Sequence, residues 1–182
     1  MEKQTDKNQN EENNSKASKR LDPNTIAGFL QAILEEEGIE YKLLKPDNDS
    51  AAYVFGITYK EKKFVVSAWN HRTVLYALRG WPKRELSNTD NEYLIIRAVN
   101  ETNKRHPPKI IYDFESNKGI KYLTLWCTLN IFWLPGMPTP GAFLKENLDC
   151  MLESQEIFEQ ISKEQQIGLM PNINVNSSQY KA

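Results

Sequence analysis

Residue types that often act as bases, nucleophiles or metal ligands are scarce in this sequence, which has two histidines and two cysteines among 182 residues. His71 is expected in a tight turn between two strands, and His106 just before two prolines at the end of a helix. Neither lies beside a nucleophile or a metal-binding pattern, so we interpret both as surface turn residues. Asp113 and Glu115 stand two apart, a spacing that could serve acid–base chemistry, but beside the turn "ESNKG" we favour a solvated role.

The cysteines, Cys127 and Cys150, form neither a disulfide framework nor a metal-ligand pattern. Cys127 falls on the apolar face of an expected strand and is interpreted as a small core residue, while its pairing with Cys150 stays open. The sequence contains no GxGxxG, GKS or GKT loop, HExxH or GxSxG motif. We therefore predict a protein that is not an enzyme, with no catalytic residues, no metal site and no cofactor.

The longest uncharged segment, residues 122–144, indicates a strand with one face in a core. Its odd positions from Leu123 to Trp133 are all apolar, while the even positions from Tyr122 to Phe132 mix hydroxyls, an amide and aromatic rings. A period of two over this length is typical of a half-buried strand. The prolines and glycines that follow exclude a membrane-spanning helix.

Helix and strand signals elsewhere predict an α+β fold. One helix is expected from Asp22, as its N-cap, to Gly38; a second starts at Thr89, which has capping-box spacing to Glu92; the last begins at Pro140 or Gly141. Short strand-like runs lie between them, near residues 40–44, 51–59, 63–69, 73–78 and 109–114. The order α-β-β-β-β-α-β-β-α predicts an antiparallel sheet of five to six strands with helices packed on one face.

Composition divides the chain into a single domain at residues 21–165, a disordered tail at 1–20 and a flexible C-terminal tail at 166–182. The first 20 residues are nearly all Lys, Glu, Asn, Gln and Ser, which cannot bury enough apolar surface to fold. They also lack the apolar segment of a secretory signal, so a cytoplasmic location is expected.

The charge pattern leaves nucleic-acid binding as an alternative. The formal net charge is −1, which argues against a generic nucleic-acid binder. The region 79–109 is nevertheless basic, with Trp81 near these residues: Arg79, Lys83, Arg84, Lys104, Arg105 and Lys109. Basic groups beside an aromatic ring can bind single-stranded nucleic acid. A nucleic-acid-binding regulator is therefore the second hypothesis, and an enzyme without a recognisable motif the third.

The second face of the 122–133 strand is the predicted partner site. Tyr122, Trp126 and Phe132 would form an apolar surface there, and Met137 in the loop "LPGMPTPG" would border it. We expect a protein or peptide partner and a homodimer. The alternative is that the last helix or the C-terminal tail covers this face within one chain.

Three segments between residues 24 and 162 give a resemblance to a known family. They are "IAGFLQAILEEEGIEYKLL", "KFVVSAW" and "VNETNKRHPPKIIYDFESNKGIKYLTLWCTL", the last with spaced asparagines, a Tyr-Asp pair and a glycine turn. The chain resembles the YbjN-like family, whose fold is similar to that of class I type III secretion chaperones. The resemblance implies a cytoplasmic, dimeric binding module without chemistry of its own. It further implies a role like that of a chaperone, which holds partly unfolded segments, or in stress response or regulation.

Overall fold

The computed structural model describes residues 20–44, 52–69, 74–87, 91–134, 136–165 and 167. Within these ranges the elements follow one another as α1 (Ile26–Glu36), β1 (Glu40–Leu44), β2 (Ala52–Tyr59), β3 (Lys62–Trp69), β4 (Val74–Gly80), β5 (Arg84–Glu85), α2 (Glu92–Arg105), β6 (Lys109–Asn117), β7 (Ile120–Phe132) and α3 (Pro140–Glu164). Almost all of the two predicted tails lies outside the described residues, and the domain boundaries stay predictions.

The strands form one antiparallel sheet, as the sequence predicts. Strands β1 to β4 are neighbours in chain order, and β7 follows β4 in the sheet. The 13-residue β7 also pairs with β6 and, past the end of β4, with β5. The α+β prediction is confirmed, with one strand more than expected. The additional strand, β5, has only two residues, too few to show any periodicity.

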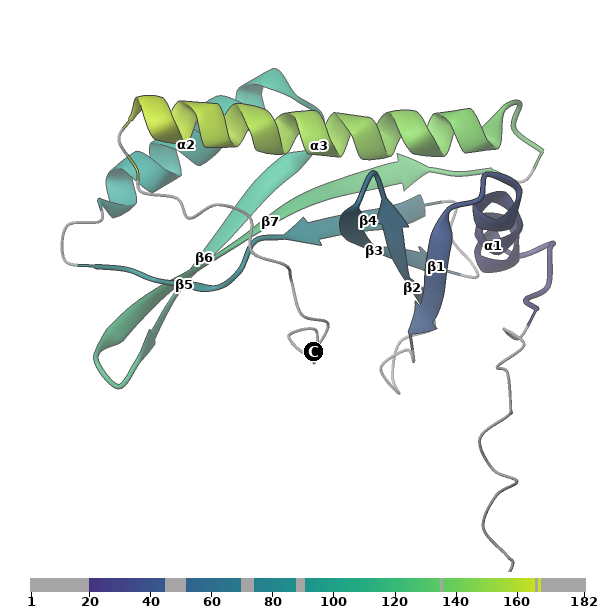
Figure 1. Cartoon of the computed structure of the whole chain (residues 1–182), viewed down its shortest axis with the longest axis horizontal. Helices are drawn as coiled ribbons and strands as arrows, with labels where there is room; N and C mark the ends of the chain where they lie inside the picture. Colours follow the sequence, from purple (N-terminus) through teal and green to yellow (C-terminus); the bar gives the residue numbers. More distant parts are fainter. Residues whose placement is uncertain are drawn as a thin grey trace, which may run out of the picture.

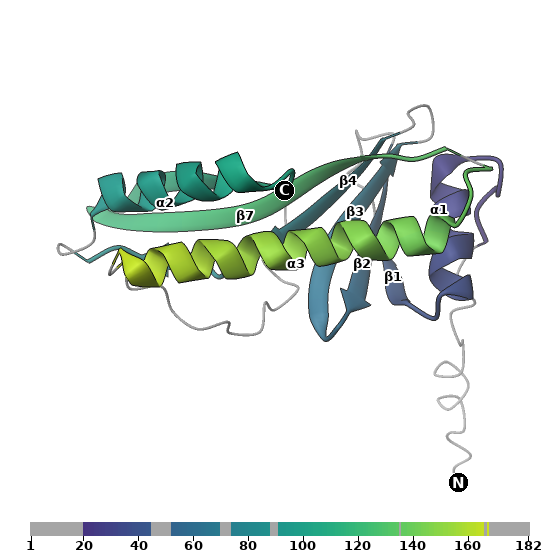
Figure 2. The ribbon, with the colours of Figure 1, turned by 90° about the horizontal axis from the view of Figure 1, so that it is seen from above.

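The helices lie on one side of this sheet (Figures 1 and 2). The long α3 runs along the sheet, α2 lies beside it near β6 and β7, and α1 lies at the β1 end. Odd positions of β7 face this helical layer, since they are the buried ones: Leu123, Leu125, Cys127 and Ile131. The predicted alternation of this strand is therefore confirmed.

The core between sheet and helices is large and apolar. From α3 it receives Leu144, Leu148, Met151 and Phe158, all fully buried. Complete burial of one such side chain stabilises the fold by roughly 1.5–3 kcal/mol. Trp133, just after β7, is also fully buried and its ring centroid lies 5.5 Å from that of Phe29 in α1 and 6.2 Å from that of Phe143 in α3. This indole therefore joins the end of the longest strand to two helices.

Helix ends agree with the sequence signals in part. Helix α1 ends before Gly38, which has the positive φ of +62° that glycine adopts easily. The prediction that Asp22 is its N-cap is wrong: Thr25 accepts the hydrogen bond from the Gly28 N–H at 3.0 Å. Asp22 instead accepts from the backbone N–H of Asn24 and forms the preceding turn. Helix α2 is capped by Asn91, and the predicted cap Thr89 lies outside the described residues.

Candidate binding surface

The face of the sheet opposite the helices, here called the outer face, carries a row of partly exposed apolar side chains. Cross-strand pairing places them on this side together with Trp126, because directly paired residues point the same way. They are Leu44, Val54, Val65, Trp69, Leu78, Ile111, Ile120, Tyr122, Trp126 and Phe132. No described helix lies over this face (Figure 1). Its residues are less buried than those of the inner face, and this is where a partner could bind.

Trp126 occupies the central position of the predicted site. It pairs with Gly80 of β4 on one side and with Ile111 of β6 on the other. Gly80 offers no side chain to pack against, so the half-buried indole has an apolar cross-strand neighbour only at Ile111, whose side chain is 43% exposed. Trp126 and Ile111 therefore form an accessible apolar spot near the middle of β7.

Tyr122 lies under a pair of charges. The Lys83 ammonium lies 4.9 Å from the centroid of the Tyr122 ring and also forms an ion pair with Glu115. Glu115 is the residue directly paired with Tyr122 on β6, so the carboxylate and the ring lie on the same face. A partner that contacted this ring would first have to move a charged pair, which makes Tyr122 a poorer anchor than Trp126.

Phe132 and Met137 differ from each other and from Trp126. Phe132 is 75% exposed at the end of β7, and Leu134 close by is 55% exposed. Phe132 lies six positions after Trp126, a distance of about 20 Å along a strand. Met137 is half-buried and packs against the main core. The four predicted residues thus do not gather in one compact patch.

The side chains suited to chemistry are dispersed or protected. Burial raises the pKa of the Cys127 thiol to about 12, and the pKa of Cys150 is also raised by burial, so both are protonated at neutral pH. His106 Nε2 lies 4.0 Å from a carboxylate oxygen of Glu153. His71 lies outside the described residues, and no cluster of three metal-binding side chains occurs among the residues described.

The basic region 79–109 is largely engaged in internal contacts. Arg79 is buried on the inner face, where its Nε donates to Gln155 Oε1 at 2.6 Å and its guanidinium lies 5.9 Å from the Phe64 ring centroid. Its interpretation as a surface phosphate contact is therefore wrong, because β4 parity points this residue toward α3.

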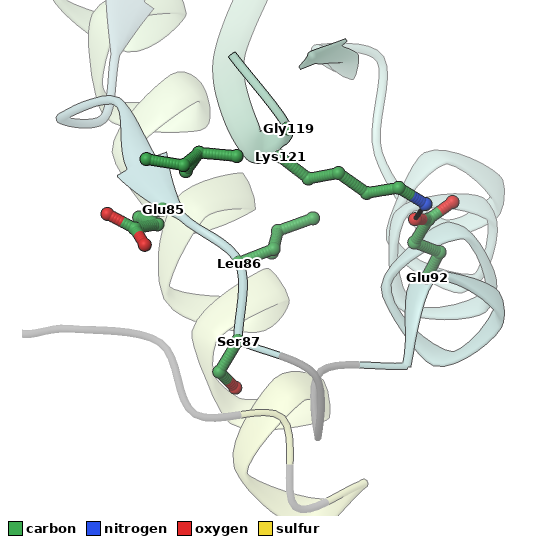
Figure 3. Close-up of a pocket in the computed structure, with 7 residues that line it drawn as sticks. Glu85, Leu86, Ser87, Glu92, Gly119 and Lys121 are labelled. Atoms are coloured by element: carbon green, nitrogen blue, oxygen red, sulfur yellow. Dashed lines mark hydrogen bonds and ion pairs between the residues drawn. The ribbon is translucent and has the colours of Figure 1, made fainter. Parts of the chain in front are cut away.

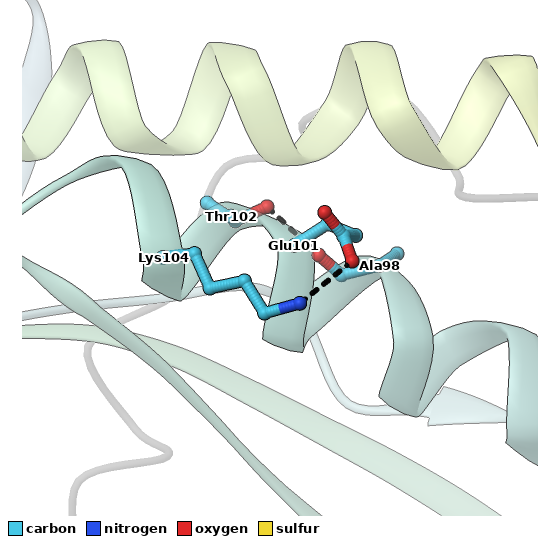
Figure 4. A network of polar contacts seen from close by, with 4 residues as sticks. All are labelled: Ala98, Glu101, Thr102 and Lys104. Atoms are coloured by element: carbon cyan, nitrogen blue, oxygen red, sulfur yellow. Dashed lines mark hydrogen bonds and ion pairs between the residues drawn. The ribbon is translucent and has the colours of Figure 1, made fainter.

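Two lysines of this region also have partners. Lys104 pairs with Glu101 at 3.0 Å on the surface of α2, next to the Thr102 hydroxyl that donates to Ala98 O (Figure 4). That lysine lowers the pKa of Glu101 through a hydrogen bond. Lys109 donates to the carbonyl oxygens of Asn103 and His106. Of the basic residues in this region, Arg79 is thus closed off from a nucleic acid, and the nucleic-acid hypothesis otherwise stays a prediction.

A shallow polar pocket of about 350 Å³ lies where β5, the start of β7 and α2 meet (Figure 3). Its lining includes Glu85, Ser87 and an ion pair between Lys121 and Glu92 at 2.8 Å. The described residues of the lining include no His or Cys. We therefore consider it less suited to binding or chemistry than the outer face.

Two neighbours of Trp126 were missed by sequence reasoning. Ile111 and Gly80 lie next to Trp126 because of the register in which β6 and β4 pair with β7. The sequence indicates this register only at the β6–β7 turn. That turn contains Lys118 and Gly119 with positive φ, so Asn117 pairs with Ile120 and every later pair is fixed, including that of Ile111 with Trp126. The hairpin signal "ESNKG" could have identified Ile111.

Comparison with known proteins gives one distant likeness. No family model and no curated protein matches the sequence. Among solved structures, the crystal structure of YbjN from E. coli, a candidate transcription regulator, is similar with a TM-score of 0.45 and 13% sequence identity, over 80% of this chain and 96% of that chain. The chain thus has a distant fold likeness to YbjN, and the expected link to type III secretion chaperones stays a prediction. None of the described helices combines the length and apolar composition that a membrane crossing requires.

Proposed function

We propose that this chain is a non-catalytic, cytoplasmic protein-binding module, with a chaperone-like or regulatory role, that holds an apolar segment of a partner on the outer face around Trp126. The observation that carries the proposal is the arrangement of Trp126 beside Ile111 and Gly80 on the face without a described helix. A large ring with an open neighbour position is a frequent anchor in protein interfaces. Both cysteine thiols are protonated at neutral pH, which favours binding over thiol-based catalysis.

The test is Trp126→Ala, compared with Phe132→Ala as a matched aromatic control about 20 Å away on the same face. Trp126→Ala is expected to leave the melting temperature nearly unchanged. It should lower the free energy of binding to the partner by about 2 kcal/mol, as is typical of a central aromatic anchor, and so reduce the amount of partner captured from cell extract. The same proteins captured equally by both variants would contradict the proposal, as would a loss of stability that makes Trp126 a core residue.

Homodimerisation through the outer face is a second, competing proposal, because a second copy bound around Trp126 would cover the site for a partner's segment. An apolar surface of this kind is often covered in solution by a second copy. Size-exclusion chromatography with light scattering should then give twice the chain mass, and Trp126→Asp should give the mass of one chain. A single-chain mass for the wild type at every concentration would leave the outer face to a different partner.

A further inference from the structure

Strand β6 forms one edge of the sheet, and one of its residues is paired by a side chain. Asn103, near the end of α2, accepts a hydrogen bond from the Ile110 N–H at 2.7 Å and donates to the Ile110 carbonyl at 2.9 Å. In an antiparallel sheet the N–H and C=O of one residue point to the same side. Since those of Ile110 point to Asn103, they point away from β7. The Asn103 amide therefore takes the place of a neighbouring strand at this position.

The alternation then fixes which other β6 groups point outward. Tyr112, Phe114 and Ser116 have the same orientation as Ile110, whereas Ile111, Asp113 and Glu115 bond to β7. No described residue forms a hydrogen bond to the outward N–H and C=O groups of Tyr112, Phe114 and Ser116. The Asn103 side chain thus pairs with Ile110 alone, and the outward N–H and C=O groups at the next three outward positions are free to pair with another strand.

This edge lacks three of the usual protections against added strands, which are a short strand, a proline and a bulge. Native edges are often short or interrupted by Pro or a bulge. The opposite edge, β1, has five residues, whereas β6 has nine, no proline and a regular pairing with β7 throughout. Tyr112 is also 39% exposed, and its ring packs at 5.3 Å from that of Phe114. The β6 edge therefore offers both backbone groups and apolar contact to an extended segment.

The charges on β6 indicate which segment fits. Asp113 and Glu115 are exposed on the outer face, and of the two Glu115 has an ion pair, with Lys83. If a second copy paired antiparallel in a register centred on Asp113, Phe114 or Glu115, acidic side chains would face acidic side chains. Like charges directly opposite each other destabilise a strand pair, whereas opposite charges stabilise it. A strand with basic side chains on this face is therefore favoured over a second copy.

We propose that the β6 edge binds an extended, basic segment of a partner protein, which adds a strand at Tyr112–Ser116 with a lysine or arginine opposite Asp113. The backbone groups of Tyr112, Phe114 and Ser116 supply the hydrogen bonds, and Asp113 selects the charge. The Tyr112–Phe114 ring pair on the other face accepts the apolar side chains that alternate with the basic ones. This site uses the edge of the sheet, so it stands or fails independently of docking around Trp126.

The experiment measures binding of two labelled peptides to the full chain by fluorescence anisotropy. One peptide alternates lysine and valine, and the other alternates glutamate and valine. The lysine peptide is expected to bind about tenfold more tightly, as one favourable charge pair is exchanged for one unfavourable pair. Asp113→Lys should reverse this preference, and a lysine peptide methylated on the backbone nitrogens that face β6 should lose binding.

A matched pair of variants isolates the backbone contribution. Ser116→Pro removes an outward N–H without breaking the ladder to β7, because proline is tolerated on the open side of an edge strand. Ser116→Pro should lower the affinity for the lysine peptide about tenfold. Ser116→Ala keeps the N–H and should leave this affinity unchanged. Circular dichroism melts confirm that both variants fold. Equal affinity of the two Ser116 variants, or an unchanged charge preference in Asp113→Lys, would overturn the proposal. A dimer that Ser116→Pro dissociates, without peptide binding by the wild type, would overturn it in favour of a second copy.

Discussion

Leu125 and Trp126 are adjacent in β7 but belong to two different surfaces. The inner face around Leu125 is closed by α3 and contains fully buried side chains such as Cys127 and Trp133. The outer face around Trp126 holds residues of similar size that stay partly exposed. Large apolar side chains occur on both sides of the strand, so hydrophobicity alone does not define the core. The two faces differ because the described helices pack against one side of the sheet only.

Leu125→Asp should give the largest effect among the variants that test this comparison. An aspartate at this buried position would lose its hydration without gaining a partner, and such a change costs more than about 4 kcal/mol. Much of a typical domain's total stability of about 5–15 kcal/mol would be lost. Circular dichroism should show an unfolded or molten chain at 25 °C. A cooperative melt close to that of the wild type would mean that Leu125 is not in the core.

Trp133→Ala should follow, with a loss of about 3–5 kcal/mol in the free energy of unfolding. The indole packs against Phe29 and Phe143, so its removal opens a cavity between α1, α3 and the end of β7. Urea denaturation measures the loss. Trp133→Phe is the conservative control and should recover part of it, and a loss below 1 kcal/mol would contradict the role of this ring.

The pH dependence of the free energy of unfolding tests whether the Cys127 thiol is buried on the inner face. Burial raises the pKa of its thiol in the folded chain to about 12 from an ordinary value of 9.0, so the folded state holds the proton more tightly than the unfolded state. The stabilisation is complete below pH 9 and is lost as the pH rises toward 12, with a loss of about 1.4 kcal/mol at pH 10.

The control for this pH effect is Cys127→Ala, which keeps every other titrating group. Urea denaturation at pH 8 and pH 10 should give a smaller difference in stability for Cys127→Ala than for the wild type. Equal differences in the two proteins would show that the Cys127 thiol is not closed off from water.

Phe132→Ala should give the smallest effect, below about 0.5 kcal/mol, because the ring is 75% exposed and has little packing to lose. Thermal melting in the same buffer as Trp133→Ala makes the comparison direct, since the two aromatic residues are adjacent in sequence. A loss for Phe132→Ala comparable to that for Trp133→Ala would show that something covers the outer face.

Local patterns in the sequence predict most of the fold and less of the site. The period of two in β7 and the signals at Gly38 and Pro140 identify a strand, a helix end and a helix start correctly. The cluster of basic residues near Trp81 predicts that Arg79 lies on the surface, although its parity with Ala77 points it inward. The partner of this guanidinium, Gln155, is 76 residues away, and no local rule connects them.

The sequence predicts which face of the sheet holds the candidate site, but not which residues of that face are accessible. Parity places Trp126, Tyr122 and Phe132 on one face, but it does not give the cover of Lys83 and Glu115 over Tyr122. That contact depends on β5, a strand too short to recognise. Met137 was expected at the border of the site from its loop, and its packing against the core depends on where the loop passes. Tertiary arrangement therefore decides which members of a face are accessible.

The Asn103–Ile110 contact also gives the edge of the sheet an uneven hydrogen-exchange pattern. The amide proton of Ile110 should exchange slowly although no strand lies on its side of β6, since its nitrogen lies 2.7 Å from the Asn103 side-chain oxygen that accepts it. The next outward amides, at Tyr112, Phe114 and Ser116, should exchange with solvent quickly, while those between them are held by β7. Deamidation of Asn103 would replace the amide N–H₂ donor with a second acceptor oxygen, which repels the Ile110 carbonyl. The protected end of the strand would then loosen as the protein ages.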